Sequence, residues 1–273
     1  MNFRHVPVVA GLTLIAAAAF AEPSSPAPDI SGLWQKGPLA LLQPVDALAP
    51  AVRPSDSKFN ERDPFSPLRG DAGNPNLQPR AADAVRKYAE AEAAGRHLPT
   101  PQEVCRPSGV PMVTTLPGPM EIVQAPREVL FIYQRDSQVR HVLLQQDHSR
   151  NLRPSPYGES IGHYEGDTLV VDTMGMTADT PVDLFGTPHS GEMHVIERYR
   201  LAQQGDRARL QVQIAVDDPQ MFKRPWGGML AYGRLAGSRW AGQTELEEET
   251  CAENNRDFGG TDYPIPIAAR PDF

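Results

Sequence analysis

From Met120 onward, short runs of alternating apolar and polar residues are separated by turn residues. Such alternation places every second side chain on the same face of a β-strand. Consecutive runs pair as hairpins: "MEIVQ" with "EVLFIYQ", "EVLFIYQ" with "VRHVLLQ", "SIGHY" with "TLVVDTM", "MHVIERYRL" with "RLQVQIAV", and "MLAYGRL" with "TELEEET". The pattern predicts a mainly β protein in which most strands are antiparallel neighbours joined by tight turns.

A meander of this length must protect its edge strands, and closing the sheet into a barrel removes those edges. We therefore expect an up-and-down, lipocalin-like β-barrel of about 8–10 antiparallel strands, which can enclose one small ligand. A two-sheet β-sandwich is the alternative. The barrel body is expected at residues 120–252, followed by a C-terminal tail at 253–273.

The segment before the barrel, residues 22–119, is rich in proline and alanine and shows little periodicity. It is expected to be an irregular arm with two regular elements. The first is a strand of the barrel at residues 30–34, "ISGLW". The second is a helix at residues 79–94, where a proline suits the first turn and Gly95 suits the C-terminal cap.

The first residues have the pattern of a secretory signal peptide. Arg4 precedes an apolar run from Val8 to Phe20, and the small residues Ala19 and Ala21 provide a cleavage site. The run is shorter than the roughly 20 residues that cross a bilayer. We expect cleavage after residue 21 and a periplasmic or secreted protein that has no membrane contact afterwards.

The chain contains two cysteines, Cys105 and Cys251. Disulfides persist in the oxidising compartments that an exported protein reaches. We therefore expect a disulfide that ties the middle of the chain to its C-terminal part.

The charge balance limits the partners. A formal net charge of -8 argues against nucleic acids, because binding them rests on neutralising phosphates with lysine and arginine. The sequence has neither a phosphate-cradling glycine loop nor a dinucleotide fingerprint. We expect a small-molecule ligand and no cofactor, and the sequence does not indicate an oligomeric state.

The stretch "PHSGEMHVIERYR", residues 188–200, concentrates histidines and glutamates. On a helix, a His-Glu-x-x-His spacing places metal ligands on one face, but here the pattern predicts a strand, where only residues of equal parity share a face. Glu192 and His194 meet that condition, whereas His189 and Glu197 do not. We therefore expect no metal site.

General acid and base catalysis suits these residues better. Asp172 interrupts an apolar strand, where a carboxylate is costly unless it is solvated or paired. Histidine is the side chain whose pKa lies nearest neutral pH. Parity places Glu197 on the apolar face of its strand, with Val195 and Tyr199. The candidate catalytic residues are His189, His194, Asp172 and Glu197, and the candidate binding residues are Tyr133, Arg198, His163 and Trp226.

Several segments together resemble a family of exported, mostly uncharacterised bacterial proteins: "DISGLW", "EIVQ", "GHYEGDTLVVDTMGM", "PHSGEMHVIERYR", "DDPQMFKRPW" and "ETCAENN". The resemblance covers most of residues 29–255 and implies export. The chain departs from the family pattern at Met176, where the family has phenylalanine, and after "HS", where the family has an acidic residue.

Two functions are consistent with these features. The first is an exported, cofactor-independent enzyme that acts by general acid and base catalysis on a small apolar or aromatic molecule, by elimination as in a lyase, by isomerisation or by hydrolysis. The alternative is a periplasmic binding or carrier protein without catalytic activity. An enzyme needs a histidine within hydrogen-bond reach of a carboxylate or tyrosine in a pocket, whereas a carrier needs an enclosed apolar cavity.

Overall fold

The computed structural model describes residues 27–36, 42–55, 69–96, 98–235, 245–249 and 251. The predicted signal peptide at residues 1–21 and the predicted tail at 253–273 lie outside these ranges. Within them, no helix is both long and apolar enough to cross a membrane.

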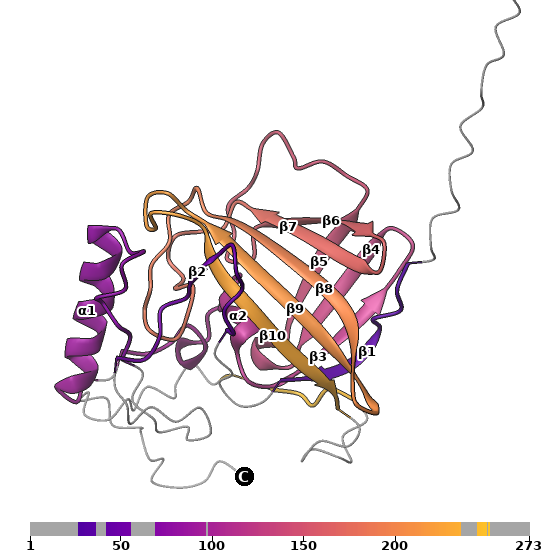
Figure 1. Ribbon diagram of the computed structural model, residues 1–273, viewed down its shortest axis with the longest axis horizontal. Helices are drawn as coiled ribbons and strands as arrows, with labels where there is room; N and C mark the ends of the chain where they lie inside the picture. Colours follow the sequence, from indigo (N-terminus) through magenta and orange to yellow (C-terminus); the bar gives the residue numbers. More distant parts are fainter. Residues whose placement is uncertain are drawn as a thin grey trace, which may run out of the picture.

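Within the described residues, nine strands close into a β-barrel (Figure 1). Strand β1 pairs with β3 on one side and with β10 on the other, and these pairings close the sheet. The lipocalin-like barrel predicted from the alternation is confirmed, and the β-sandwich alternative is not formed. The strands of the barrel are β1 (Gly32–Gln35), β3 (Pro119–Gln124), β4 (Glu128–Tyr133), β5 (Gln138–Leu144), β6 (Glu159–Glu165), β7 (Thr168–Met174), β8 (His194–Gln204), β9 (Arg207–Asp217) and β10 (Trp226–Arg234). A short strand, β2 (Ala49–Pro50), pairs in parallel with β10.

One pair of neighbours departs from the antiparallel meander. β5 and β6 are parallel, with Val142 opposite Ser160. Parallel neighbours need a crossover connection, because the chain must return to the end at which the first strand began. The segment 145–158 provides it, and the two strands therefore do not form a hairpin.

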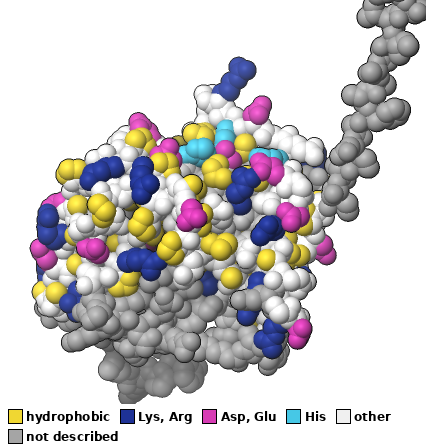
Figure 2. All heavy atoms as spheres, viewed as in Figure 1, with side chains coloured by type: hydrophobic (Ala, Val, Ile, Leu, Met, Phe, Trp, Pro, Cys, Tyr) yellow, Lys and Arg dark blue, Asp and Glu magenta, His cyan; other side chains and the backbone are white. Residues whose placement is uncertain are grey.

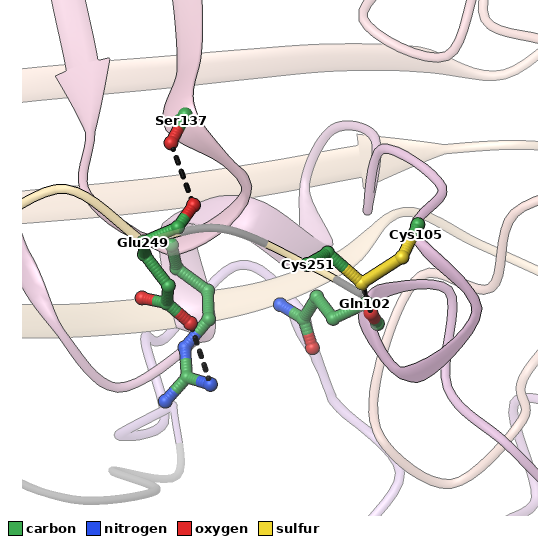
Figure 3. Close-up of a disulfide and its surroundings, with 6 residues drawn as sticks. Gln102, Cys105, Ser137, Glu249 and Cys251 are labelled. Atoms are coloured by element: carbon green, nitrogen blue, oxygen red, sulfur yellow. Dashed lines mark hydrogen bonds and ion pairs between the residues drawn. A yellow bond between two sulfur atoms is a disulfide. The ribbon is translucent and has the colours of Figure 1, made fainter. Parts of the chain in front are cut away.

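The last predicted hairpin is wrong. Residues 245–249, which form most of "TELEEET", contain no strand. Side-chain contacts hold this segment instead: Arg135 lies 3.2 Å from Glu249, and the Ser137 hydroxyl donates to the Glu249 carbonyl at 3.0 Å (Figure 3). Both partners lie in the short η2 turn (Arg135–Ser137) between β4 and β5. Their positions could not be read from local alternation.

The predicted arm carries more structure than expected. α1 (Pro79–Ala93) matches the predicted helix and buries Ala81 and Val85 completely. A further short helix, α2 (Met112–Thr115), packs among the buried groups of the barrel, where the Tyr232 hydroxyl donates to the Thr114 carbonyl. A single 3-10 turn, η1 (Gln102–Val104), precedes Cys105. The arm thus supplies both a helix beside the barrel (Figure 1) and an internal contact of the barrel.

Cys105 and Cys251 form the predicted disulfide, with their Cα atoms 5.5 Å apart (Figure 3). The bond joins positions separated by 146 residues along the chain. It therefore attaches the C-terminal segment after β10 to the loop that follows α1.

Replacing both cysteines with serine is expected to lower the free energy of unfolding by about 2–5 kcal/mol, because the bridge restricts a long loop in the unfolded chain. Urea unfolding with and without a reductant measures the effect. The oxidised protein should unfold at higher urea than the double variant, and a reductant should change only the former. Equal urea midpoints for the double variant and the disulfide-bonded protein without reductant would contradict the prediction.

Candidate functional site

Two histidines meet one carboxylate on the outer face of the barrel. His194 Nε2 lies 2.7 Å from Asp172 Oδ1, and His148 Nε2 lies 3.0 Å from the same oxygen. The other ring nitrogen of His148, Nδ1, lies 3.1 Å from Glu159 Oε1. Histidine side chains gather beside acidic ones at the top of the molecular surface in Figure 2. We call His194, Asp172, His148 and Glu159 the histidine–carboxylate chain.

The alternation of side chains along β7 and the path of the crossover segment bring the histidine–carboxylate chain together. Val171 and Thr173 are buried, so Asp172 between them points outward. On neighbouring strands, Ile161 and Ile196 stand directly opposite Asp172. His148 comes from the crossover segment 145–158. The carboxylate that interrupted the apolar strand is therefore paired with two histidines and flanked by two isoleucines.

The contact between His194 and Asp172 favours the charged form of both side chains. The hydrogen bond to Asp172 raises the pKa of His194 above its ordinary value, against a smaller opposing effect of burial. Burial by itself would raise the pKa of Asp172, but the hydrogen bonds from His194 and His148 hold that pKa below its ordinary value. The side chains of His194 and Asp172 are 37% and 30% exposed, so solvent and a small molecule can reach both.

Ser149 anchors the far end of the chain. Its backbone N–H donates to Glu159 Oε1 at 2.7 Å, and its hydroxyl donates to Oε2 at 2.5 Å. These hydrogen bonds hold the pKa of Glu159 below its ordinary value. Glu159 is thus a fixed acceptor for His148. The hydrogen bonds from His148 to Glu159 and to Asp172 form together only when both ring nitrogens carry protons, because both acceptors are carboxylates.

Replacing Asp172 with asparagine is expected to lower the pKa of His194 toward 6.5, because the ring loses a charged acceptor. The stabilisation from this pair is fully present below the pKa of the unfolded chain and is lost as the pH rises through the folded pKa. NMR titration of the His194 ring measures both proteins. The His163 ring, which contacts Glu165 and not Asp172, serves as the internal control. An unchanged His194 midpoint would contradict the assignment.

His189 lies apart from this chain and is buried. Its Nδ1 donates to the Ser190 carbonyl at 2.8 Å, and its Nε2 lies 3.1 Å from the Thr180 hydroxyl. Burial lowers the pKa of His189, with the Ser190 carbonyl opposing the effect. No carboxylate within the described residues is hydrogen-bonded to this ring. The geometry supports a structural role for His189. The predicted catalytic role would need a hydrogen-bonded carboxylate, and the described residues do not provide one to this ring.

Ser190 also has a structural environment. Its hydroxyl donates to Asp218 Oδ1 at 2.9 Å, and its backbone N–H donates to Asp218 Oδ2 at 2.6 Å. Asp218 is fully buried. The "HS" and "DDP" segments therefore hold each other in place through one carboxylate, which joins the loop before β8 to the end of β9.

Glu197 points into the barrel, as parity predicted, and is fully buried. Its Oε2 lies 2.5 Å from Arg140 Nη2, and its Oε1 accepts from Thr114 at 2.9 Å and from Tyr199 at 2.8 Å. Burial would lower the pKa of Arg140, but the Glu197 carboxylate holds it above its ordinary value. Glu197 is therefore the partner of a buried cation, and it does not orient either of the histidines proposed as proton carriers.

The structure separates the four predicted binding residues. Tyr133 is buried inside the barrel near Arg140, and burial raises its pKa. Trp226 is a core residue whose ring lies 5.3 Å from that of Phe222. Arg198 and His163 lie on the outer face, where both contact Glu165. The predicted set thus does not line one pocket.

Sequence reasoning missed His148, Glu159 and Arg140. His148 lies in the crossover segment, which has no periodicity that could orient it. Arg140 did carry a signal, because it has the same parity as the inward-facing Val142. No group of three or more histidine, cysteine, aspartate or glutamate side chains in the described ranges has the geometry of a metal site.

Comparison with known proteins adds no assignment. No protein-family model, curated protein or solved structure matches the chain. The histidine–carboxylate chain must therefore be interpreted from its own geometry.

Proposed function

We propose that this protein is an exported enzyme that uses general acid and base catalysis at His194 and Asp172. The observation that carries the proposal is the 2.7 Å contact between a half-exposed imidazole and a carboxylate on the outer face of the barrel. A histidine held by a carboxylate is a competent proton carrier near neutral pH. The disulfide supports export, because such bonds persist in oxidising compartments.

Each residue of the chain has a distinct role in the proposal. His194 donates Nε2–H to Asp172, so its Nδ1 is the nitrogen that takes a proton from the substrate. Asp172 sets this tautomer and stabilises the imidazolium that forms. His148 and Glu159 are positioning residues, since His148 contacts the same Asp172 oxygen as His194 and Glu159 holds His148.

The substrate is a small molecule with an apolar or aromatic part. Ile161 and Ile196 flank Asp172 on the outer face and offer apolar surface next to the proton carrier. In an elimination, His194 Nδ1 takes a proton from carbon, the C–H electrons form a double bond, and the leaving group departs with its electron pair. Isomerisation and hydrolysis begin with the same transfer, from carbon or from water.

The carrier alternative receives less support. A carrier would use the barrel interior, but its inner face holds the Arg140–Glu197 ion pair together with Tyr199 and Phe131, whose rings lie 4.8 Å apart. An enclosed apolar ligand would therefore lie against a buried ion pair. The catalytic proposal uses the outer face, where the His194–Asp172 contact supplies the hydrogen-bonded pair that an enzyme needs; this pair lies outside the pockets lined by Tyr88 and by Tyr133.

The test is a turnover screen of the purified protein. Single-ring aromatic compounds with an acidic C–H bond and a leaving group, or with a hydrolysable ester, are incubated at several pH values with and without EDTA. We expect turnover with at least one class, and EDTA should leave its rate unchanged. Binding without turnover would favour the carrier, and loss of activity in EDTA would overturn the metal-independent mechanism.

A further inference from the structure

A separate pocket of about 140 Å³ lies between α1, the loop that contains η1, and the loop between β7 and β8. Tyr88 of α1 forms one wall, and the backbone of Gly186 packs closely against its ring. The other lining residues include Pro99, Pro101, Pro181, Arg106, Asp179 and Asp183. None of them belongs to the histidine–carboxylate chain.

The pocket is shaped before any ligand binds. The Tyr88 hydroxyl donates to the Leu98 carbonyl at 3.3 Å, and the disulfide at Cys105 fixes the loop between the lining residues Val104 and Arg106. Asp183 Oδ1 accepts from the backbone N–H groups of Phe185 and Thr187 at 2.9 and 3.1 Å. A preformed wall reduces the ordering cost of binding.

Acidic side chains outnumber basic ones around the aromatic wall. Asp183 and Asp179 line the pocket, and the charges of Glu92 and Glu103 also act on Tyr88. Burial raises the pKa of Tyr88, and the charges of Glu92, Glu103 and Asp183 raise it further. Arg106 is the one basic side chain among the lining residues. An anionic ligand is therefore disfavoured.

One of the carboxylates is poorly compensated. Asp183 Oδ2 is buried and has no hydrogen-bond partner among the described residues. Burial raises the pKa of Asp183, with the hydrogen bonds from Thr187 and Phe185 opposing the effect. A buried carboxylate gains from a nearby cation, because low-dielectric surroundings strengthen the attraction.

We propose that this pocket binds a small organic ammonium ion, with its alkyl groups against the prolines and Tyr88 and its charge beside Asp183 and Asp179. Aromatic rings attract cations, and quaternary ammonium groups are recognised in this way. The volume is comparable to that of a cavity of roughly 150 Å³ that admits benzene, so one compact head group fits. The site is independent of the proposed catalytic function.

Calorimetry with choline and with its neutral isostere 3,3-dimethylbutan-1-ol tests the charge requirement. Choline should bind about tenfold or more tightly than the alcohol, because only choline carries the charge. Equal affinities, or no detectable binding of choline at tens of millimolar, would overturn the proposal. Turnover is not used as a readout, so failure here does not bear on the catalytic proposal.

Variants locate the site. Tyr88→Leu should weaken choline binding roughly 5- to 30-fold, whereas Tyr88→Phe, which keeps the ring, should retain most of it. Asp83→Asn, which alters an acid on α1 outside the lining, is the matched control and should not change affinity. Circular dichroism checks that each variant is folded. A folded Tyr88→Leu variant with unchanged affinity, or equal losses in it and Asp83→Asn, would overturn the assignment.

Discussion

Replacing His194 with glutamine is expected to slow the turnover of an identified substrate by about 10²- to 10⁴-fold while leaving the fold intact. Glutamine is of similar size and can still donate a hydrogen bond to Asp172, but it cannot accept and return a proton. Because the His194 side chain is partly exposed, we expect the substitution to cost little stability. Single-turnover kinetics measure the chemical step, and circular dichroism checks the fold.

His141→Gln is the matched control for this prediction. His141 also pairs with a carboxylate on the outer face, with Nδ1 2.9 Å from Glu128 Oε2, but it lies on β5 and outside the histidine–carboxylate chain. It should retain full turnover. Full activity in His194→Gln would end the assignment, and equal losses in the two variants would indicate a general effect of removing a surface histidine.

Replacing Glu197 with glutamine is expected to lower the free energy of unfolding by about 3–5 kcal/mol, because it leaves the Arg140 guanidinium buried without its counter-ion. Thr114 and Tyr199, which donate to Glu197 Oε1, would retain only a neutral acceptor. Urea unfolding followed by tryptophan fluorescence gives the change.

Two further variants separate charge burial from simple loss of contacts. Glu165→Gln breaks an ion pair with Arg198 on the outer face and should have little effect, because solvent already screens that pair. Arg140→Met combined with Glu197→Leu removes both buried charges and should recover part of the lost stability. If Glu197→Gln is as stable as Glu165→Gln, the buried pair is not the source of the stability.

Most of the barrel could be predicted because its hairpins are local. Alternation within "TLVVDTM" and "MHVIERYRL" indicates which residues face inward. Short linkers between consecutive strands indicate that these strands are antiparallel neighbours. "TELEEET" has strand-like spacing but forms no strand in its described part, since contacts with η2 hold it. The parallel pairing of β5 and β6 depends on the path of the crossover, which has no periodic signal.

The sequence nominated two members of the candidate site: Asp172, because it interrupts an apolar strand, and His194, because of its imidazole. It did not predict that these two pair with each other, and it nominated His189 and Glu197 beside them. His148 reaches Asp172 from the crossover segment, and no local pattern specifies that approach. The pairing of His194 with Asp172 is a result of packing, and so is the position of His189, which has no hydrogen bond to a carboxylate of the described residues.

The sequence by itself determined the alternation of the strands, the helix at Pro79, the pairing of two cysteines and the inward direction of Glu197, because each depends on local geometry or on a single possible partner. Only the tertiary structure decided that Glu197 neutralises Arg140, that β6 runs parallel to β5, and that His148 and His194 share one carboxylate oxygen. These contacts join segments far apart in the chain. Their geometry is set by barrel closure and by the path of the crossover, which residue spacing does not encode.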